Sequence, residues 1–313
     1  MKFPKYILLS GLLLVSTFSM GQKLLSHVIN DFTEINPAAI STVKTFQINL
    51  KGFNYPELDR FYNGGYLKFI APVSKINSTI GFHAQFFGID DFMDFSDFKY
   101  GLSYSYSYNI SEKAYLAIGA KASVYSYRAK FYEFSINYIN YNEIDYKSDQ
   151  LNIDAGIWYQ SKNLGIGLSY NHINTPEHKI GIENSPYSFN PNPYLYEPEF
   201  NLMLDHILNF TEIFSMNNSM LMYDVTGIND LLELNINNIL FINNTFFFGT
   251  SWRILSNDAA FISNYQVFGF NLKNVYGLYF SLKTYDNGDD KKYFIDTSNK
   301  FHSYFECSLV INL

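Results

Sequence analysis

Two groups of acidic residues are the first candidates for chemistry in this sequence. One group consists of Asp90, Asp91, Asp94 and Asp97, and the other is the stretch Asp-Asn-Gly-Asp-Asp at residues 286–290. Clustered carboxylates suit a hard cation such as Ca²⁺, which takes oxygen ligands. Neither group has the spacing of a calcium-binding loop, and Asp-Asn-Gly is a common turn sequence. A cation site and a solvated turn both stay open, and the missing spacing favours the turn.

Two histidines could form a different kind of site. His172 and His178 flank Pro176 and could bind a metal ion or act in catalysis. No carboxylate or nucleophile stands at motif spacing from them, so we favour a role in which His, like Tyr, suits a membrane interface. The chain also has no GxSxG motif and no phosphate-binding glycine loop. We therefore predict that the protein is not an enzyme and has no catalytic residue, metal site or cofactor.

The composition is typical of a chain whose apolar and polar residues alternate. Of the 313 residues, 47% are hydrophobic, 19% are aromatic and only 16% are charged, yet the mean hydropathy is −0.10. An ordinary soluble domain has roughly 25% charged residues. Abundant aromatic residues with near-zero hydropathy are expected of strands that face lipid on one side and water on the other.

Charge and cysteine content exclude several other classes. Acidic residues outnumber basic ones by 29 to 22, which argues against nucleic acid as a partner, because proteins that bind it usually carry a basic field. Cys307 is the single cysteine, so an intramolecular disulfide, a cysteine-based zinc site and a CxxC redox pair are excluded.

The first residues have the features of a secretory signal peptide. Lys2 and Lys5 precede an apolar stretch at 6–18, and Ser-Met-Gly at 19–21 forms a small-x-small cleavage site. We predict a signal peptide at 1–21 and a single mature domain at 22–313. No later window has eighteen consecutive apolar residues, so only a closed β-barrel could hold the mature chain in a membrane.

Period-two alternation recurs along the mature chain. From residue 98 to 109 every even position is apolar or aromatic, and every odd position is polar or Gly. Fourteen such runs occur, and most have the roughly 9–11 residues that a tilted strand needs to cross a bilayer. They lie near 43–52, 64–72, 78–88, 97–109, 113–127, 150–161, 164–173, 199–210, 218–226, 231–242, 245–255, 259–270, 275–285 and 300–313. The predicted fold is all-β, a transmembrane antiparallel β-barrel of about 14 strands; the alternative, a soluble β-sandwich, should have more exposed charge and fewer exposed aromatics.

The connections between these runs predict how the barrel is oriented. If the N-terminus is periplasmic, the even-numbered connections are all short, and the three longest, at 128–149, 174–198 and 286–299, are odd-numbered. Outer-membrane barrels have short periplasmic turns and longer extracellular loops. We therefore expect an even strand count, both termini in the periplasm, and the three long segments outside the cell.

Two of the long segments are candidates for binding a partner. The segment 174–198 combines prolines with aromatic residues, and 128–149 is rich in Tyr and Phe. Prolines stiffen a loop, and aromatic side chains give contact area at low entropic cost. A structural cap over the barrel mouth is an equal alternative. The candidate contact residues are Tyr138, Tyr141, Tyr146, Tyr187, Phe189, Tyr194 and Tyr196.

Four short motifs, in matching order, resemble a known family. They are Asn-Pro-Ala at 36–38, the alternating hairpin at 151–176 with its Gly-Leu-Ser, His and Pro, Gly-Thr-Ser-Trp-Arg at 249–253, and Ser-Tyr-Phe-Glu-Cys-Ser-Leu at 303–309. Together they resemble the PorP/SprF-type outer-membrane proteins of the Bacteroidota type IX secretion and gliding machinery. Tyr-Gly-Leu-Tyr-Phe-Ser at 276–281 departs from the Tyr-Ser-Tyr-Asp usual in that family, which indicates a divergent member.

The resemblance implies a non-enzymatic outer-membrane barrel that supports export or surface anchoring of a secreted, adhesin-like protein. Its implied partners are a secreted type IX substrate, periplasmic ring components of the machinery and outer-membrane lipid. It brings no catalytic residues; Pro176 would end a strand, and Gly165 and Gly167 would allow close backbone packing. A channel or transporter for a small solute or lipid is the alternative function, and a hydrolase with rim carboxylates is a third. The sequence favours neither an open nor a plugged lumen.

Overall fold

The computed structural model describes most of the chain after residue 30. The described residues are 31–57, 60–90, 95–134, 141–175, 177–178, 194–195, 198–225, 231–256, 261–272, 276–286 and 305–313. The predicted signal peptide lies outside them and stays a prediction. None of the helices within these ranges is long and apolar enough to cross a membrane.

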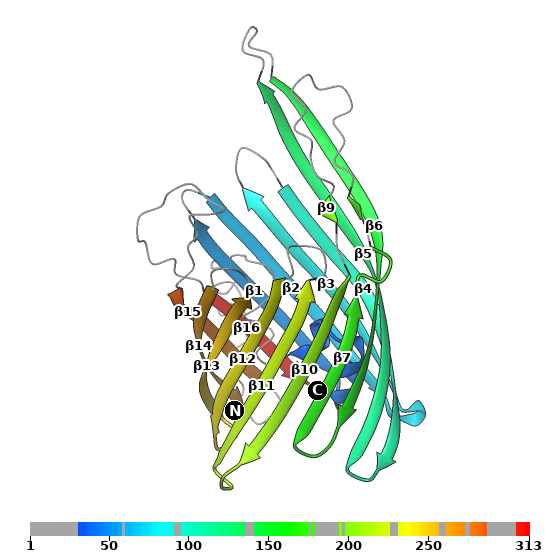
Figure 1. The fold of residues 1–313 in the computed structure, drawn as a ribbon, viewed down its shortest axis with the longest axis vertical. Coiled ribbons are helices and arrows are strands. Elements are labelled where there is room, and N and C mark those ends of the chain that lie inside the picture. Colours follow the sequence, from blue (N-terminus) through cyan, green and yellow to red (C-terminus); the bar gives the residue numbers. More distant parts are fainter. Residues whose placement is uncertain are drawn as a thin grey trace, which may run out of the picture.

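The strands form one closed antiparallel barrel, as Figure 1 shows, so the predicted fold class is confirmed. Each of the fourteen predicted runs overlaps one barrel strand. The barrel strands are β1 (Gln47–Glu57), β2 (Arg60–Val73), β3 (Ser78–Asp90), β4 (Phe95–Ser111), β5 (Ala114–Phe134), β6 (Tyr141–Gln160), β7 (Leu164–Asn171), β10 (Glu199–Asn209), β11 (Phe214–Val225), β12 (Leu231–Ile242), β13 (Phe246–Ser256), β14 (Phe261–Leu272), β15 (Tyr276–Asp286) and β16 (Phe305–Asn312). Two short strands, β8 (Glu177–His178) and β9 (Tyr194–Leu195), pair with each other in a separate sheet.

Pairing of the first strand with the last closes the wall. Successive barrel strands pair with each other, and β1 pairs with β16 in a register that runs from Gln47 opposite Asn312 to Asn54 opposite Phe305. Closure leaves the barrel without a free sheet edge at membrane depth, where unpaired backbone groups would have no water to bind.

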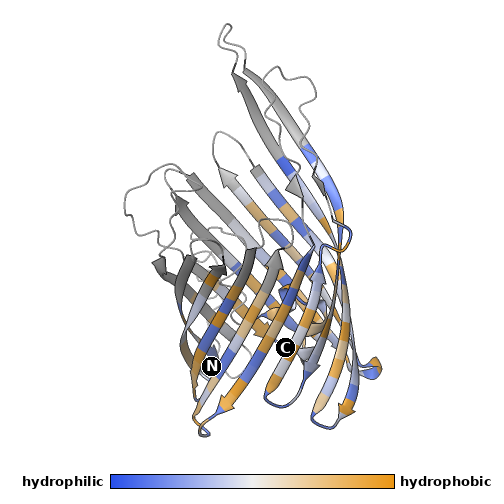
Figure 2. Cartoon of the chain, viewed as in Figure 1, coloured by the Kyte–Doolittle hydropathy of each residue, from blue (hydrophilic) through white to orange (hydrophobic). Residues whose placement is uncertain are grey.

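Strand β4 shows that the barrel is polar inside and apolar outside. The outward side chains include Leu102, 61% exposed, and Tyr108, 64% exposed, whereas the intervening Ser103 and Ser105 are 6% and 0% exposed. Apolar and hydrophilic residues alternate in this way along the strands in Figure 2. Because the exposed positions carry apolar side chains, the outer face of this wall suits contact with lipid.

The two rims of the barrel differ. One rim, which we call the short-turn rim, carries the start of β1 and the end of β16. Its connections are 74–77, 112–113, 161–163, 210–213, 243–245 and 273–275. The opposite rim, the long-loop rim, carries the other connections, including 172–198 and 287–304. The predicted sorting of short and long connections onto opposite rims is therefore confirmed, while the side of the membrane that each rim faces stays a prediction.

The structure corrects the prediction of a loop at 128–149, because most of this segment is strand. β5 and β6 stay paired from Ala129 opposite Tyr146 to Phe134 opposite Tyr141, so that only 135–140 connects them. In Figure 1 the resulting β5–β6 hairpin rises beyond the ends of the other strands. β4 leaves this hairpin early, since its last pair with β5 joins Phe95 to Ala129.

The outward side chains of the hairpin mark where the lipid-facing belt ends. Outward apolar residues continue up to the pair Val124–Leu151, and the next outward pairs are Ser126–Asp149 and Arg128–Lys147. Charged side chains at alternate positions are unfavourable against hydrocarbon but suit water. The part of the hairpin above Leu151 therefore stands clear of the membrane.

Replacing Leu102 with Arg should destabilise the barrel far more than replacing Tyr108 with Arg. Leu102 lies midway along the outward face of β4, whereas Tyr108 lies near the short-turn rim. An Arg at the bilayer midplane costs about 2–4 kcal/mol, falling to about 0–1 kcal/mol at the interface. Denaturant unfolding of the barrel in lipid vesicles measures the two free energies, and equal losses would contradict the assigned lipid face.

Candidate functional site: a plug in the barrel lumen

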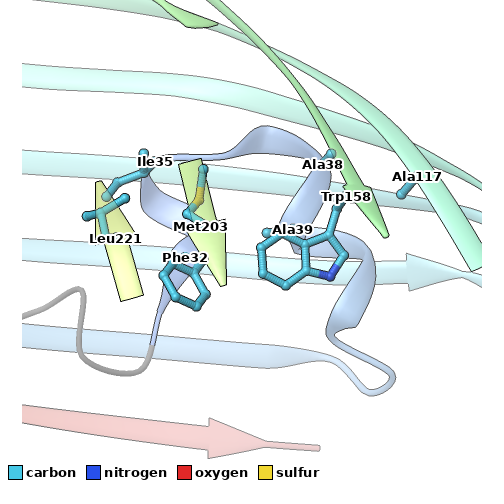
Figure 3. Packing of buried hydrophobic residues seen from close by; sticks show 8 residues of the cluster. All are labelled: Phe32, Ile35, Ala38, Ala39, Ala117, Trp158, Met203 and Leu221. Atoms are coloured by element: carbon cyan, nitrogen blue, oxygen red, sulfur yellow. The ribbon is translucent and has the colours of Figure 1, made fainter. Parts of the chain in front are cut away.

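The segment that precedes β1 fills part of the lumen, which we call the plug and define as residues 31–43. It contains two short 3-10 helices, η2 (Phe32–Glu34) and η3 (Pro37–Thr42). Figure 3 shows its apolar side chains packed against residues from four strands. The cluster comprises Phe32, Ile35, Ala38 and Ala39 of the plug with Ala117 of β5, Trp158 of β6, Met203 of β10 and Leu221 of β11. The plug therefore occupies part of the lumen, where the sequence favoured neither an open nor a plugged one.

Local capping explains why this stretch forms two tight turns. The Asp31 carboxylate accepts a hydrogen bond from the Thr33 N–H at 3.1 Å, at the start of η2. The Asn36 side chain accepts one from the Ala38 N–H at 2.9 Å, and Pro37 occupies the first helical position of η3. Asn and Asp caps with Pro at the first position are the usual start of a helical turn.

Asn36 also fastens the plug to the barrel wall. Its amide nitrogen donates to the carbonyl of Ile157 in β6 at 2.9 Å and to that of Leu168 in β7 at 3.2 Å. The side chain is fully buried, with 0% exposure. A buried amide that lost these partners would cost about 1–3 kcal/mol, so this contact fixes the position of η3.

Glycines in the wall make room for this contact. A Cβ atom on Gly119 would lie 2.4 Å from the Ala38 nitrogen, and one on Gly156 would lie 2.1 Å from the Asn36 amide oxygen. Gly165 and Gly167 leave space for the Trp158 ring, which a Cβ at either position would approach to 2.5 or 2.4 Å. Gly165 and Gly167 thus allow close packing, but of the Trp158 side chain rather than of the backbone as predicted.

Buried charges hold the other end of the plug. Asp31 forms an ion pair with Lys68 of β2, and Glu34 forms one with Lys51 of β1. Burial raises the pKa of Asp31, but the nearby ammonium groups of Lys68 and Lys51 lower it by more. The resulting pKa is about 2. Asp31 therefore stays ionised at neutral pH, and Lys68 and Lys51 each have an anionic partner on the plug.

A polar network links the plug to the long-loop rim. The ammonium of Lys121 in β5 donates to the Glu34 carbonyl at 3.1 Å and pairs with Asp154 of β6 at 2.7 Å. Asp154 in turn accepts a hydrogen bond from the His172 backbone N–H at 2.9 Å, just after the end of β7. The network thus runs from η2 to the start of the 172–198 connection.

His172 has a structural role, but it does not lie where the sequence predicted. Its ring lies in the lumen, where Nδ1 is 2.7 Å from the Asn152 amide oxygen, and its φ of 57° is left-handed. The prediction of a membrane-interface position was therefore wrong for His172. His178 pairs in register with Tyr194 in the small sheet. Within the described ranges, no three His, Cys, Asp or Glu side chains are grouped to hold a metal ion.

The other predicted site residues are scattered. Tyr141 and Tyr146 lie on β6 and Tyr194 lies on β9, whereas Tyr138, Tyr187, Phe189 and Tyr196 are outside the described residues. Asp91, Asp94 and residues 287–290 are also outside them. Asp97, on β4, lies 3.4 Å from Lys99. Sequence reasoning missed the plug as a site, although the caps Asp31 and Asn36 with Pro37 were a visible signal.

Comparison with known proteins agrees with this architecture. The family described as "Type IX secretion system membrane protein PorP/SprF" matches residues 28–293 of the chain. No curated protein matches its sequence.

Three solved structures share the fold at 10% sequence identity. The toluene transporter TbuX of Ralstonia pickettii matches with a TM-score of 0.52 over 89% of this chain and 92% of that one. A FadL homologue of Pseudomonas aeruginosa matches with a TM-score of 0.50 over 90% and 93%. The toluene transporter TodX of Pseudomonas putida matches with a TM-score of 0.52 over 95% and 93%. At such low identity the likeness is one of fold alone.

Gly119→Ala should loosen the plug. The added methyl would collide with backbone atoms of Pro37 and Ala38, so either the plug shifts or the barrel loses about 1–3 kcal/mol through overpacking. Ion conductance in planar bilayers should rise. The matched control is Gly65→Ala, whose Cβ would lie 3.5 Å from its nearest neighbour, the Lys51 carbonyl, and it should behave as wild type. Equal conductance in both variants would argue against the packing described.

Lys68→Met should free the amides of the plug to exchange with water. It leaves Asp31 buried without its main cation, a loss of about 3–5 kcal/mol for a buried pair. Adding Asp31→Asn removes the stranded charge, so the double variant should regain much of the lost protection. Hydrogen exchange of residues 31–42 measures this, and losses that simply add in the double variant would show that the pair is not coupled.

Proposed function

Because the chain belongs to the PorP/SprF family of type IX secretion system membrane proteins, we propose that it holds a secreted protein of that system at the cell surface. The chain is an outer-membrane barrel and a component of type IX secretion. The proposed partner is an adhesin-like substrate, bound without covalent chemistry at the long-loop rim. Periplasmic ring components of the machinery would contact the short-turn rim.

The observation that carries this proposal is the β5–β6 hairpin. Its upper part stands clear of the lipid-facing belt, and regular pairing from Ser126–Asp149 to Phe134–Tyr141 stiffens it. A stiff projection loses little entropy when a partner binds, which favours affinity. Tyr138, Tyr141 and Tyr146 belong to this projection in sequence. Tyr187, Phe189, Tyr194 and Tyr196 belong in sequence to the 172–198 connection, whose strand β8 lies beside β6.

The plug supports binding rather than free passage. The ion pairs of Asp31 and Glu34 and the buried Asn36 amide hold it across the lumen. A polypeptide that used this part of the lumen would have to break these contacts. We therefore propose that the partner is engaged at the rim, with both termini of the barrel in the periplasm and the hairpin outside the cell.

A hairpin truncation tests the proposal. In this variant an Asn-Gly turn replaces residues 130–145, joined at the Ala129–Tyr146 pair, so that the barrel wall is left intact. Affinity purification from native membranes should recover a secreted protein with the wild-type barrel and at least tenfold less with the truncated one. The control is the double variant Glu112→Ser and Lys113→Ser on the opposite rim, which should recover as much secreted protein as the wild type. A wild-type barrel that purifies alone, or equal recovery with the truncation, would contradict the proposal.

Passage of a small solute or lipid is the second candidate. Two of the solved structures that share the fold are named toluene transporters, and the plug is a separate segment rather than one of the wall strands. Liposome swelling with the wild-type barrel separates the two candidate functions, because a channel should admit solute even when the plug is unaltered.

A further inference from the structure

The upper part of β6 pairs with a described strand along only one of its two edges. β6 pairs with β5 along its whole length, but with β7 only from Ala155 to Gln160. β7 ends at Asn171, and β10 begins beside it at Glu199. Among the strands that the structure describes, none pairs with β6 between 141 and 154 on the edge away from β5. β8 lies beside β6 but pairs with β9.

The backbone of this edge has a known direction. The Ile153 carbonyl accepts a hydrogen bond from the Ile173 N–H at 2.9 Å, on the side away from β5. Backbone groups of an antiparallel strand alternate between its two edges, so odd-numbered residues of β6 direct N–H and C=O away from β5. Glu143, Asp145, Lys147 and Asp149 therefore present a row of donors and acceptors.

One amide already occupies the lower end of this edge. The Asn174 side chain accepts from the Ile153 N–H at 2.9 Å and donates to the Leu151 carbonyl. These are the donor and acceptor that a neighbouring strand would engage. The chain thus places a carboxamide, the chemical group of a peptide bond, where regular pairing with β7 stops.

Charge narrows the choice of occupant. Lys147 and Asp149 are the charged side chains of this edge that the structure describes, and Arg128 of β5 lies opposite Lys147. Lys147 and Asp149 are 54% and 49% exposed, and their mutual contact is 3.3 Å. Opposite charges on directly facing residues stabilise a strand pair, and like charges destabilise it. A strand with Asp or Glu facing Lys147 and Lys or Arg facing Asp149 complements these two residues.

We propose that β6 receives, at residues 141–149, an extended segment of the secreted partner that adds a strand to the hairpin and carries an acidic residue facing Lys147 and a basic residue facing Asp149. Long, flat, unprotected strand edges are avoided in proteins unless another chain pairs with them. No register shift interrupts the β5–β6 pairing that supports this edge. The inference rests on the proposed function and names the surface through which that function works.

Lys147→Pro tests the added strand. Proline removes the edge-directed N–H at 147 and takes none from the β5 ladder, since the 147 backbone points away from β5. The probe is the secreted protein that purifies with the wild-type barrel. Lys147→Pro should weaken its binding at least tenfold, whereas the matched control Lys147→Ala, which keeps the N–H, should weaken it less than threefold. Asp149→Lys, which places a like charge opposite the partner's basic residue, should also weaken binding.

Hydrogen exchange on the wild-type barrel gives a readout that does not depend on a variant folding. Binding of the same secreted protein should protect the amides of 143, 145, 147 and 149. Unchanged exchange there would overturn the inference, as would slow exchange already present in the free barrel or cross-linking of β6 to a second copy. If the hairpin truncation abolishes binding while Lys147→Pro does not, the added strand is refuted and the proposed function stands. If the wild type binds no secreted protein, both fail.

Discussion

Hydrogen bonding of the backbone in a medium without water is the constraint on which this structure depends. Each strand at membrane depth needs a neighbour on both edges, so the first strand must meet the last, and Gln47 lies opposite Asn312. Closure then reverses the usual location of apolar residues: Leu102 faces lipid and Ser105 faces the lumen. A barrel with a polar lumen can in turn accept a plug that is held by buried ion pairs and amide contacts rather than by a large apolar core.

The plug is fitted to its wall residue by residue. Small wall residues lie where its backbone comes close, as Gly119 does against Pro37 and Ala38. Cations lie where its carboxylates come close, as Lys68 does against Asp31. Because a buried ion pair contributes little net stability compared with an apolar contact, its main effect is on specificity and on the cost of breaking it. The plug is therefore held in one position, yet by contacts that a change in charge or a competing group can undo.

Period-two patterning predicted the wall because lipid and lumen impose opposite demands on neighbouring residues, as in the run from 98 to 109. The same signal failed at 128–149, where the outward positions Arg128, Lys147 and Asp149 are charged and the outward apolar residues found lower in β5 and β6 stop. It also failed at the plug, whose short 3-10 turns have no period to detect and whose contacts join Asn36 to Ile157 and Leu168. His172 was misplaced for a related reason: its neighbours Asn152 and Asp154 are distant in sequence, and only the register of β6 against β7 brings them together.

The constraint that closes the barrel also explains where it can be left open. Below Leu151 an unpaired edge of β6 would face hydrocarbon, and there β7 covers it, with Asn174 finishing the coverage at Leu151 and Ile153. Above Leu151 the outward residues are Asp149 and Lys147, so water can satisfy the edge there, and none of the described strands pairs with it. Water satisfies these backbone groups only weakly in competition with a strand that can bond to all of them in register. A membrane barrel can thus present an open β-edge only beyond its lipid-facing belt, and the β5–β6 hairpin is the element that carries its strand pairing farthest past that belt.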